Sequence, residues 1–276
     1  MPFHSIGCTG LFYTAPMSTH GDWNASEYHR VSDVQFRWGL QVLSELQLQG
    51  DEVVIDAGCG TGRLTSVLLE RLTTGRVVAL DASEAMLEVA RRELERFGDR
   101  VACSQADLAA LTLHSVADVI FSNATFHWVT DHDALFKSLR RALKTGGRLH
   151  AQCGGIGNLA HFQKLALGVG HEKPFTEYFA NFVSPTNFAD EASTLARLEA
   201  AGFHDQRVWL SLAPTPFETR DDFKAFINTV VLRHAAAVMP ASLHAQFLDT
   251  VVDRCAARPE GLSLDYVRLN IRAVAG

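Results

Sequence analysis

The stretch VVIDAGCGTG at residues 53–62 places a largely apolar run directly before glycines at every second position. The run is typical of a buried strand, and the helical pattern of RLTSVLLERL follows it. Glycine adopts positive φ and lets a ligand approach the backbone, so Gly58, Gly60 and Gly62 indicate a ligand-binding turn. In open α/β sheets such a turn faces the crevice at the carboxyl ends of the strands.

Strand and helix patterns alternate through the first 155 residues. Apolar residues recur at helical spacing from about residue 27 to 49. Strand-like runs then occur at EVVIDAG, GRVVALD, RVACSQAD, ADVIFSN and RLHAQCG. Helical runs at SEAMLEVARRELERF, with Ser83 as its expected N-cap, and at DHDALFKSLRRAL lie between them. This alternation predicts a parallel sheet with helices on both faces.

The second half adds a helix at ADEASTLARLEAAGF and strands at DQRVWLSL and LSLDYVRLNIRAVA. We therefore expect a single domain over residues 1–276. Its expected parts are an N-terminal arm and entry helix at 1–49, a cofactor-binding core at 50–155, and helical lid insertions at 156–185 and 216–260. The first sixteen residues are an ordered extension, a partner-contacting arm or a misassigned start.

Composition disfavours several functional classes. The formal net charge is -6 and no Lys/Arg-rich block is present, which disfavours nucleic acid as a partner. No apolar run approaches the length of a membrane span, and the N-terminus lacks an export signal. The five cysteines are odd in number and form no CxxC pair, which argues against a disulfide framework or a metal site. We expect a cytoplasmic protein, whose state as a monomer or homo-oligomer stays open.

The spacing of the glycines narrows the ligand. A dinucleotide fingerprint requires glycine at position 63, where this chain has Arg63, and no lysine follows the turn as in a phosphate-binding loop. Asp81 ends the second strand about 20 residues after the turn, where a carboxylate accepts both hydroxyls of a ribose. Asp107 ends the third strand, where it is placed to accept a hydrogen bond from an exocyclic amine. Together these features predict an adenosine-containing ligand.

The motifs VVIDAGCGTG, VVALDAS, QADLAAL, FSNATFHWV and LKTGGRL resemble those of the class I S-adenosylmethionine-dependent methyltransferases, over residues 27–155. The resemblance implies a Rossmann-like, mostly parallel seven-stranded sheet with an antiparallel last strand, and S-adenosyl-L-methionine as cofactor. It assigns the cofactor-binding residues Tyr28, Arg37, Asp56, Ala57, Gly58, Gly60, Asp81, Ala82, Met86, Asp107, Leu108, Asn123 and Ala124. Within this set the resemblance places Asp107 with Leu108 at the adenine. Tyr28 is expected either to cover the sulfonium or to staple the entry helix, and Arg37 either to meet the methionine carboxylate or to be a solvated helix charge. The entry helix carrying Tyr28, Gln35 and Arg37 is expected to fold over the cofactor.

The stretch SNATFHWV at residues 122–129 is similar to the branch that includes trans-aconitate and malonyl-carrier methyltransferases, which esterify carboxylates. His127 is the candidate catalytic residue, as general base or as donor to a carboxylate, and its alternative role is that of a partly buried histidine at a helix start. Trp128 is expected to be a packing wall of the acceptor site. The expected acceptor-binding residues are His127, Trp128, Phe162, Phe175 and Tyr178, within an aromatic group that also contains Phe179, Phe182, Phe188, Phe226 and His234.

These observations predict an enzyme that methylates a small organic acceptor, with O-methylation of a carboxylate or hydroxyl favoured. Methylation of carbon or nitrogen in a secondary metabolite is one alternative. A non-catalytic subunit that binds S-adenosylmethionine is another, and the glycine spacing disfavours a nicotinamide-dependent oxidoreductase.

Overall fold

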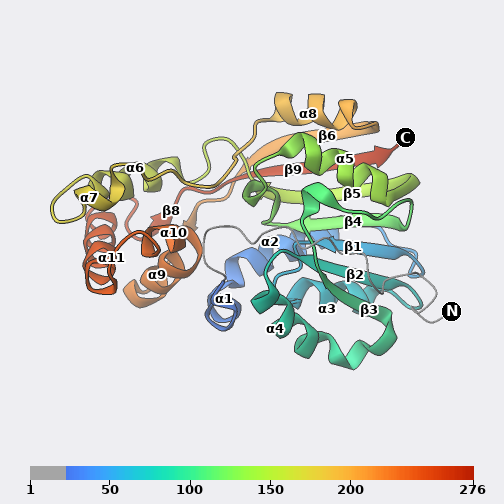
Figure 1. The fold of residues 1–276 in the computed structure, drawn as a ribbon, viewed down its shortest axis with the longest axis horizontal. Coiled ribbons are helices and arrows are strands. Elements are labelled where there is room, and N and C mark those ends of the chain that lie inside the picture. The colour runs from blue at the N-terminus through green and yellow to red at the C-terminus, as the bar shows by residue number, and fades with distance from the viewer. Residues whose placement is uncertain (1–22) are drawn as a thin grey trace.

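The structure is a computed structural model that describes residues 23–276, so the expected arm at residues 1–16 lies outside the described residues. Seven strands form one sheet in the order β3-β2-β1-β4-β5-β9-β6 (Figure 1). They are β1 (Val53–Ala57), β2 (Arg76–Asp81), β3 (Val101–Gln105), β4 (Ala117–Asn123), β5 (Leu143–Gly154), β6 (Phe203–Leu212) and β9 (Val267–Ala275). Strand β9 is antiparallel to β5 and β6, and the remaining pairs are parallel. The predicted sheet is confirmed.

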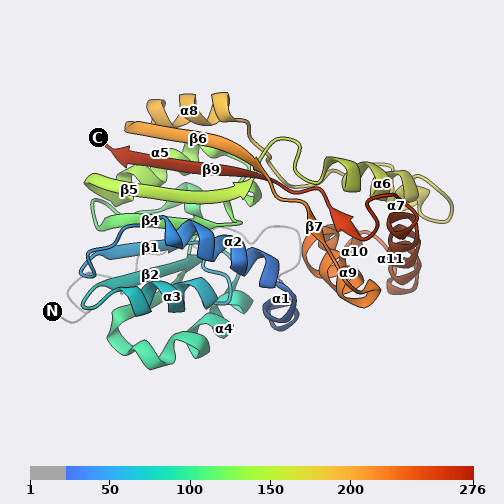
Figure 2. The same ribbon diagram turned by 180° about the vertical axis from the view of Figure 1, so that it is seen from behind.

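Two hydrophobic cores cover the two faces of the sheet, because successive side chains of a strand point to opposite faces. Val119 and Phe121 of β4 pack with α2 (Asp33–Ser44), α3 (Arg63–Arg71) and α4 (Glu84–Leu94). Ile120 between them packs with α5 (His132–Ala142) and α8 (Glu191–Ala200). Figure 2 shows α2 and α3 in front of the sheet, and Figure 1 shows α5 in front of the opposite face.

The ends of the helices follow local hydrogen bonding. Ser83 Oγ accepts a hydrogen bond from the Met86 N–H at 3.1 Å, which confirms the predicted N-cap of α4. The expected entry helix is instead two helices, α1 (Ala25–Val31) and α2, and α2 ends before residue 49. A loop replaces its last turn because the N–H groups of Gln49 and Gly50 donate to the carboxylate of Glu52 at 2.6 and 2.9 Å.

A group of helices lies beyond the carboxyl ends of the parallel strands (Figures 1 and 2). It comprises α6 (Ala160–Gly170), α7 (Thr176–Phe179), α9 (Arg220–Phe226), α10 (Arg233–Ala236) and α11 (Ala241–Ala256). These helices come from the two expected insertions and share one apolar core rich in phenylalanine. The short strands β7 (Thr215–Pro216) and β8 (Ser263–Leu264) pair where the chain enters and leaves the second insertion. Within residues 23–276 no helix is both long and apolar enough to cross a membrane.

Candidate functional site

The turn after β1 holds three glycines with positive φ, Gly58 at +86°, Gly60 at +54° and Gly62 at +83°. A Cβ at Gly58 would lie 2.1 Å from Thr125 Oγ1, and one at Gly62 would lie 3.2 Å from Ala90 of α4. A Cβ at Gly60 would meet no atom within 4 Å. Gly58 and Gly62 therefore permit close packing within the protein, whereas Gly60 faces open space.

Asp81 ends β2 beside this turn. Its Oδ2 accepts a hydrogen bond from the Gly60 N–H at 2.8 Å, and its Oδ1 accepts one from the Ser83 N–H at 2.9 Å. These bonds fix the carboxylate at the edge of a cavity that it lines together with Ala82 and Met86. A carboxylate held in this way is suited to accept hydrogen bonds from ribose hydroxyls.

The cavity has a volume of about 780 Å³ and lies at the carboxyl ends of the strands around the point where strand order reverses between β1 and β4. Its size is that of a pocket for a small organic ligand. Asp107 lines it while its Oδ1 accepts a hydrogen bond from the Ala109 N–H at 2.9 Å. The predicted site residues that line the cavity are Tyr28, Gly58, Gly60, Asp81, Ala82, Met86, Asp107, Leu108, Asn123, Ala124, His127 and Trp128.

Three predicted cofactor residues, Asp56, Ala57 and Arg37, do not line this cavity. Asp56 and Ala57 are buried beneath the turn, and Arg37 is exposed on α2. The Thr65 hydroxyl donates a hydrogen bond to Asp56 Oδ2 at 2.6 Å, so Asp56 joins β1 to α3. Burial, opposed by this hydrogen bond and aided by the negative charge of Asp81, raises the pKa of Asp56 to about 7.

Three residues of the expected aromatic acceptor pocket, Phe162, Phe175 and Tyr178, also lie away from this cavity. Phe162 and Phe175 are fully buried and face Phe223 and Phe247 in the core of the helical group, and Tyr178 packs at its edge. None of the three lines the cavity. Apolar residues at helical spacing pack first against neighbouring helices, which explains this placement. Phe188 and His234, from the same predicted aromatic group, do line the cavity.

His127 lies in a 3-10 turn, Phe126–Trp128, that follows β4, and it is 8% exposed. The Gly154 N–H donates to its Nδ1 at 3.3 Å, and the Phe188 ring stacks on its imidazole with centroids 5.7 Å apart. Burial holds the pKa of His127 well below its usual range, and the positive charge of Arg268 adds to the effect. His127 is therefore neutral, with its proton on Nε2.

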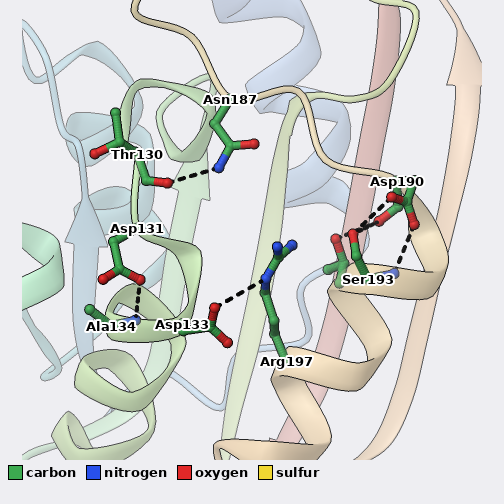
Figure 3. A network of polar contacts seen from close by, with 9 residues as sticks. Thr130, Asp131, Asp133, Ala134, Asn187, Asp190, Ser193 and Arg197 are labelled. Atoms are coloured by element: carbon green, nitrogen blue, oxygen red, sulfur yellow. Dashed lines mark hydrogen bonds and ion pairs between the residues drawn. The ribbon is translucent and has the colours of Figure 1, made fainter.

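The segment that carries Phe188 is tied to the start of α5, as Figure 3 shows. The Asn187 side chain donates to the Thr130 carbonyl at 3.0 Å, and the Asn187 N–H donates to the His127 carbonyl at 2.8 Å. Asp190 then caps α8 by accepting a hydrogen bond from the Ser193 N–H at 2.7 Å. These contacts hold the wall of the cavity beside His127.

A group of aromatic rings closes the cavity on the side of α1 and α10. The Trp23 ring lies 5.2 Å from Tyr28 and 5.6 Å from Trp128, measured between centroids. The Arg233 guanidinium lies 4.0 Å from the Trp23 centroid, in cation–π geometry. Segments far apart in the sequence therefore meet over the cavity, and the sequence patterns did not indicate Trp23 or Arg233.

Arg268 of β9 is another lining residue that the sequence analysis missed. It is 2% exposed, and its guanidinium lies 4.4 Å from the centroid of the Trp38 ring. The only relevant signal is the alternation of polar and apolar residues in VRLNIRAVA, which places Arg268 on a polar strand face but not beside a cavity.

Comparison with known proteins identifies the family. Residues 54–147 match the family model of a methyltransferase domain. A trans-aconitate 2-methyltransferase of Methylobacterium nodulans is 32% identical over 193 residues, 70% of this chain and 68% of the relative. That of Variovorax paradoxus is 30% identical over 236 residues, 82% and 86% of the two chains. The chain belongs to the class I S-adenosylmethionine-dependent methyltransferases.

Solved structures agree with the fold of this methyltransferase. The YcgJ protein of Bacillus subtilis has a TM-score of 0.60 at 15% identity, covering 86% of this chain and 96% of its own. Geranyl diphosphate C-methyltransferase of Streptomyces coelicolor has a TM-score of 0.54 at 15% identity, covering 95% and 86%. The predicted family, fold and cofactor are confirmed: the methyltransferase uses S-adenosyl-L-methionine.

The walls of the cavity fit this cofactor. Asn123 Oδ1 and Gln35 Oε1 are buried and have no hydrogen-bond partner among the described residues. Both residues line the cavity, and the Asn123 side chain is fixed because its Nδ2 donates to the Gln35 carbonyl at 2.9 Å. Buried acceptors without partners are costly, and the ammonium group of the methyltransferase's cofactor carries donors that match them.

Proposed function

We propose that this methyltransferase forms a methyl ester on a carboxylate of a small organic acid. The state of His127 is the observation that carries the proposal. A hydroxyl or amine acceptor usually has to lose a proton when it is methylated, and the enzyme then needs a base beside it. A carboxylate is already an anion and needs only donors that hold and orient it.

His127 has the properties of such a donor. Its Nδ1 already accepts the Gly154 N–H, so His127 offers the cavity an Nε2–H group and no free basic nitrogen of its own. Burial also opposes the imidazolium that a base would become. Three of the lining carboxylates, Asp81, Glu84 and Asp107, lie at or after the ends of β2 and β3, on the opposite side of β1 from β4 and His127. The fourth, Asp131, is engaged as the N-cap of α5, where its Oδ1 accepts a hydrogen bond from the Ala134 N–H at 2.9 Å.

When bound, S-adenosylmethionine supplies an electrophilic methyl group on a positively charged sulfur. We propose that Asp81 binds its ribose and that Gln35 with Asn123 binds its ammonium. Tyr28 places a neutral aromatic ring at the cavity, since burial raises its pKa to about 12. The other proposed cofactor contacts are Gly58, Gly60, Ala82, Met86, Asp107, Leu108 and Ala124.

Both helical insertions contribute to the acceptor side of the cavity. Asn158, Leu159 and Gln163 come from the insertion at 156–185, and Val230, Val231, Arg233 and His234 come from the one at 216–260. We propose that these segments form the acceptor lid of a single catalytic domain. The relatives described above are named trans-aconitate 2-methyltransferases, which makes trans-aconitate the first acid to examine.

The test incubates the protein and S-adenosylmethionine with trans-aconitate, with its triamide and with the matching triol. We expect methylation of the acid alone, seen by mass spectrometry as a product that mild alkali hydrolyses. A methylated product that resists alkali would indicate an ether, nitrogen or carbon acceptor and contradict the proposal.

His127 variants test its role as donor. Glutamine keeps an N–H donor without a useful base, so His127→Gln should retain kcat within about tenfold, while His127→Phe should lose much more. Equal loss in both variants, with the affinity for S-adenosylhomocysteine intact, would show that His127 acts as a base.

A further inference from the structure

Arg268 carries a buried positive charge with no acidic partner among residues 23–276. Its Nε donates to Gln152 Oε1 at 3.3 Å, and its Nη2 is buried without a hydrogen-bond partner. No described carboxylate lies within ion-pair distance of it. Arginine stays ionised in proteins, so this charge calls for an anion that residues 23–276 do not supply.

The neighbours that carry acidic protons do not neutralise Arg268, because they stay protonated themselves. Burial raises the pKa of Tyr28 and of the Cys153 thiol to about 12 each, and it also raises the pKa of Tyr266. Burial lowers the pKa of the Arg268 guanidinium, which is the opposite of what a carboxylate partner would do. The charge is thus desolvated at the wall of the cavity without compensation.

The guanidinium is also held in place. Gln152 receives the Arg268 Nε–H, and the Gln152 side chain in turn donates to Asn270 Oδ1 at 2.7 Å. Asn270 Nδ2 donates to Ser211 Oγ at 3.0 Å, which continues the network onto β6. The Trp38 ring packs against the guanidinium. Such support is typical of an arginine that recognises an anion with defined geometry.

The position of Arg268 in the sheet favours the acceptor over the cofactor as the source of the anion. Arg268 pairs with Gly154 of β5, and Gly154 is the residue whose N–H contacts His127. Of the proposed cofactor contacts, Gly58 follows β1 and Asn123 ends β4. Strand β9 is separated from β4 by β5, which corresponds to roughly 10 Å between strand axes.

We propose that Arg268 binds a second carboxylate of the acceptor, one that is not methylated, and thereby selects acids with at least two carboxylates. The inference rests on the proposed function for the statement that another carboxylate is methylated. Arg268 then fixes the acid at one end while His127 holds the reacting end.

Direct binding tests the inference without turnover. Calorimetry measures the affinity of trans-aconitate and of the monoacid crotonate for the protein with S-adenosylhomocysteine present, and of S-adenosylhomocysteine alone. We expect trans-aconitate to bind at least tenfold tighter than crotonate. Arg268→Gln should weaken trans-aconitate roughly 10- to 100-fold and leave S-adenosylhomocysteine unchanged.

Arg272→Gln is the matched control, since Arg272 lies four residues further along β9 on the same strand face, pairs with Glu45 and does not line the cavity. It should bind both ligands as the wild type does. If Arg268→Gln does not fold, Arg268→Lys replaces it, because lysine keeps the charge without the planar fork of donors. The comparison of the two acids in the wild type still tests the inference in that case.

Three outcomes would overturn the inference: equal wild-type affinity for the two acids, an unchanged affinity of Arg268→Gln for trans-aconitate, or a loss of S-adenosylhomocysteine binding in that variant. The last would assign Arg268 to the cofactor carboxylate. Binding of trans-aconitate through Arg268 without ester formation would leave the carboxylate-binding role of Arg268 standing and refute the proposed function. Ester formation with an unchanged KM for trans-aconitate in Arg268→Gln would support the proposed function and refute the inference.

Discussion

Replacing Gly60 by alanine separates ligand binding from folding at the turn after β1. Gly60 has a φ of +54°, and a Cβ there would meet no protein atom within 4 Å. The added methyl group would therefore project into the space that we assign to the cofactor. Gly261 has a φ of +60°, has equally open surroundings and does not line the cavity, so Gly261→Ala is the matched control.

The magnitudes follow from these surroundings. A non-glycine residue in the left-handed region costs about 1–2 kcal/mol of folding free energy, which lowers Tm by roughly 2–8 °C in either variant. An extra methyl group in a filled site costs roughly 1–3 kcal/mol more, but only where the ligand lies. We therefore expect Gly60→Ala to bind S-adenosylhomocysteine roughly 5- to 150-fold more weakly than Gly261→Ala.

Calorimetric titration with S-adenosylhomocysteine and thermal unfolding of both variants provide the measurement. Similar values of Tm with a clear difference in affinity would support the assignment of the cofactor to the glycine turn. Equal affinities in two folded variants would refute the reasoning, because the cofactor would not lie against Gly60.

Two further predictions concern charge. Asp81→Asn keeps the shape of the side chain but loses the anion that accepts hydrogen bonds from the Gly60 and Ser83 N–H groups. Calorimetry should therefore show S-adenosylhomocysteine binding roughly 10- to 100-fold more weakly. Unchanged affinity would exclude Asp81 from the ribose site. Burial, then the charges of Arg272 and Arg148, lowers the pKa of His150 to about 4. The unfolded chain therefore binds more protons between about pH 6.5 and pH 4, and the free energy of unfolding should fall by about 2 kcal/mol as pH drops through that window, allowing for partial exposure. Urea unfolding at both ends of the window should show a smaller fall for His150→Gln, and equal falls would exclude His150 as a source.

The part of the fold around the glycine turn was predictable because its signals are local. Gly58, Gly60 and Asp81 lie within about 25 residues of one another, and a βαβ unit fixes their relation whatever surrounds it. The N-cap at Ser83 is local in the same sense, and it was predicted correctly. By contrast, Asp56 shares this motif but lies beneath the turn, since its partner Thr65 comes from the following helix.

The acceptor side was less predictable because its residues come together only in three dimensions. Phe162 and Phe175 have the helical spacing of a pocket wall and of a packed core alike, and only the neighbouring helices show that they are core. Trp23 and Arg233 are far apart in the sequence, and no periodic pattern links them.

The sequence by itself determined the sheet, the glycine turn and the position of Asp81, the carboxylate that we propose binds the ribose, because short-range alternation and turn chemistry specify them. The tertiary structure decided which ring nitrogen of His127 accepts a hydrogen bond and which carries the proton, and it decided where the charge of Arg268 lies. Both depend on hydrogen bonds and burial created by β5 and β9, strands that follow His127 in the chain and meet only when the sheet forms. Charge and proton location follow from the local environment, which a sequence pattern does not contain.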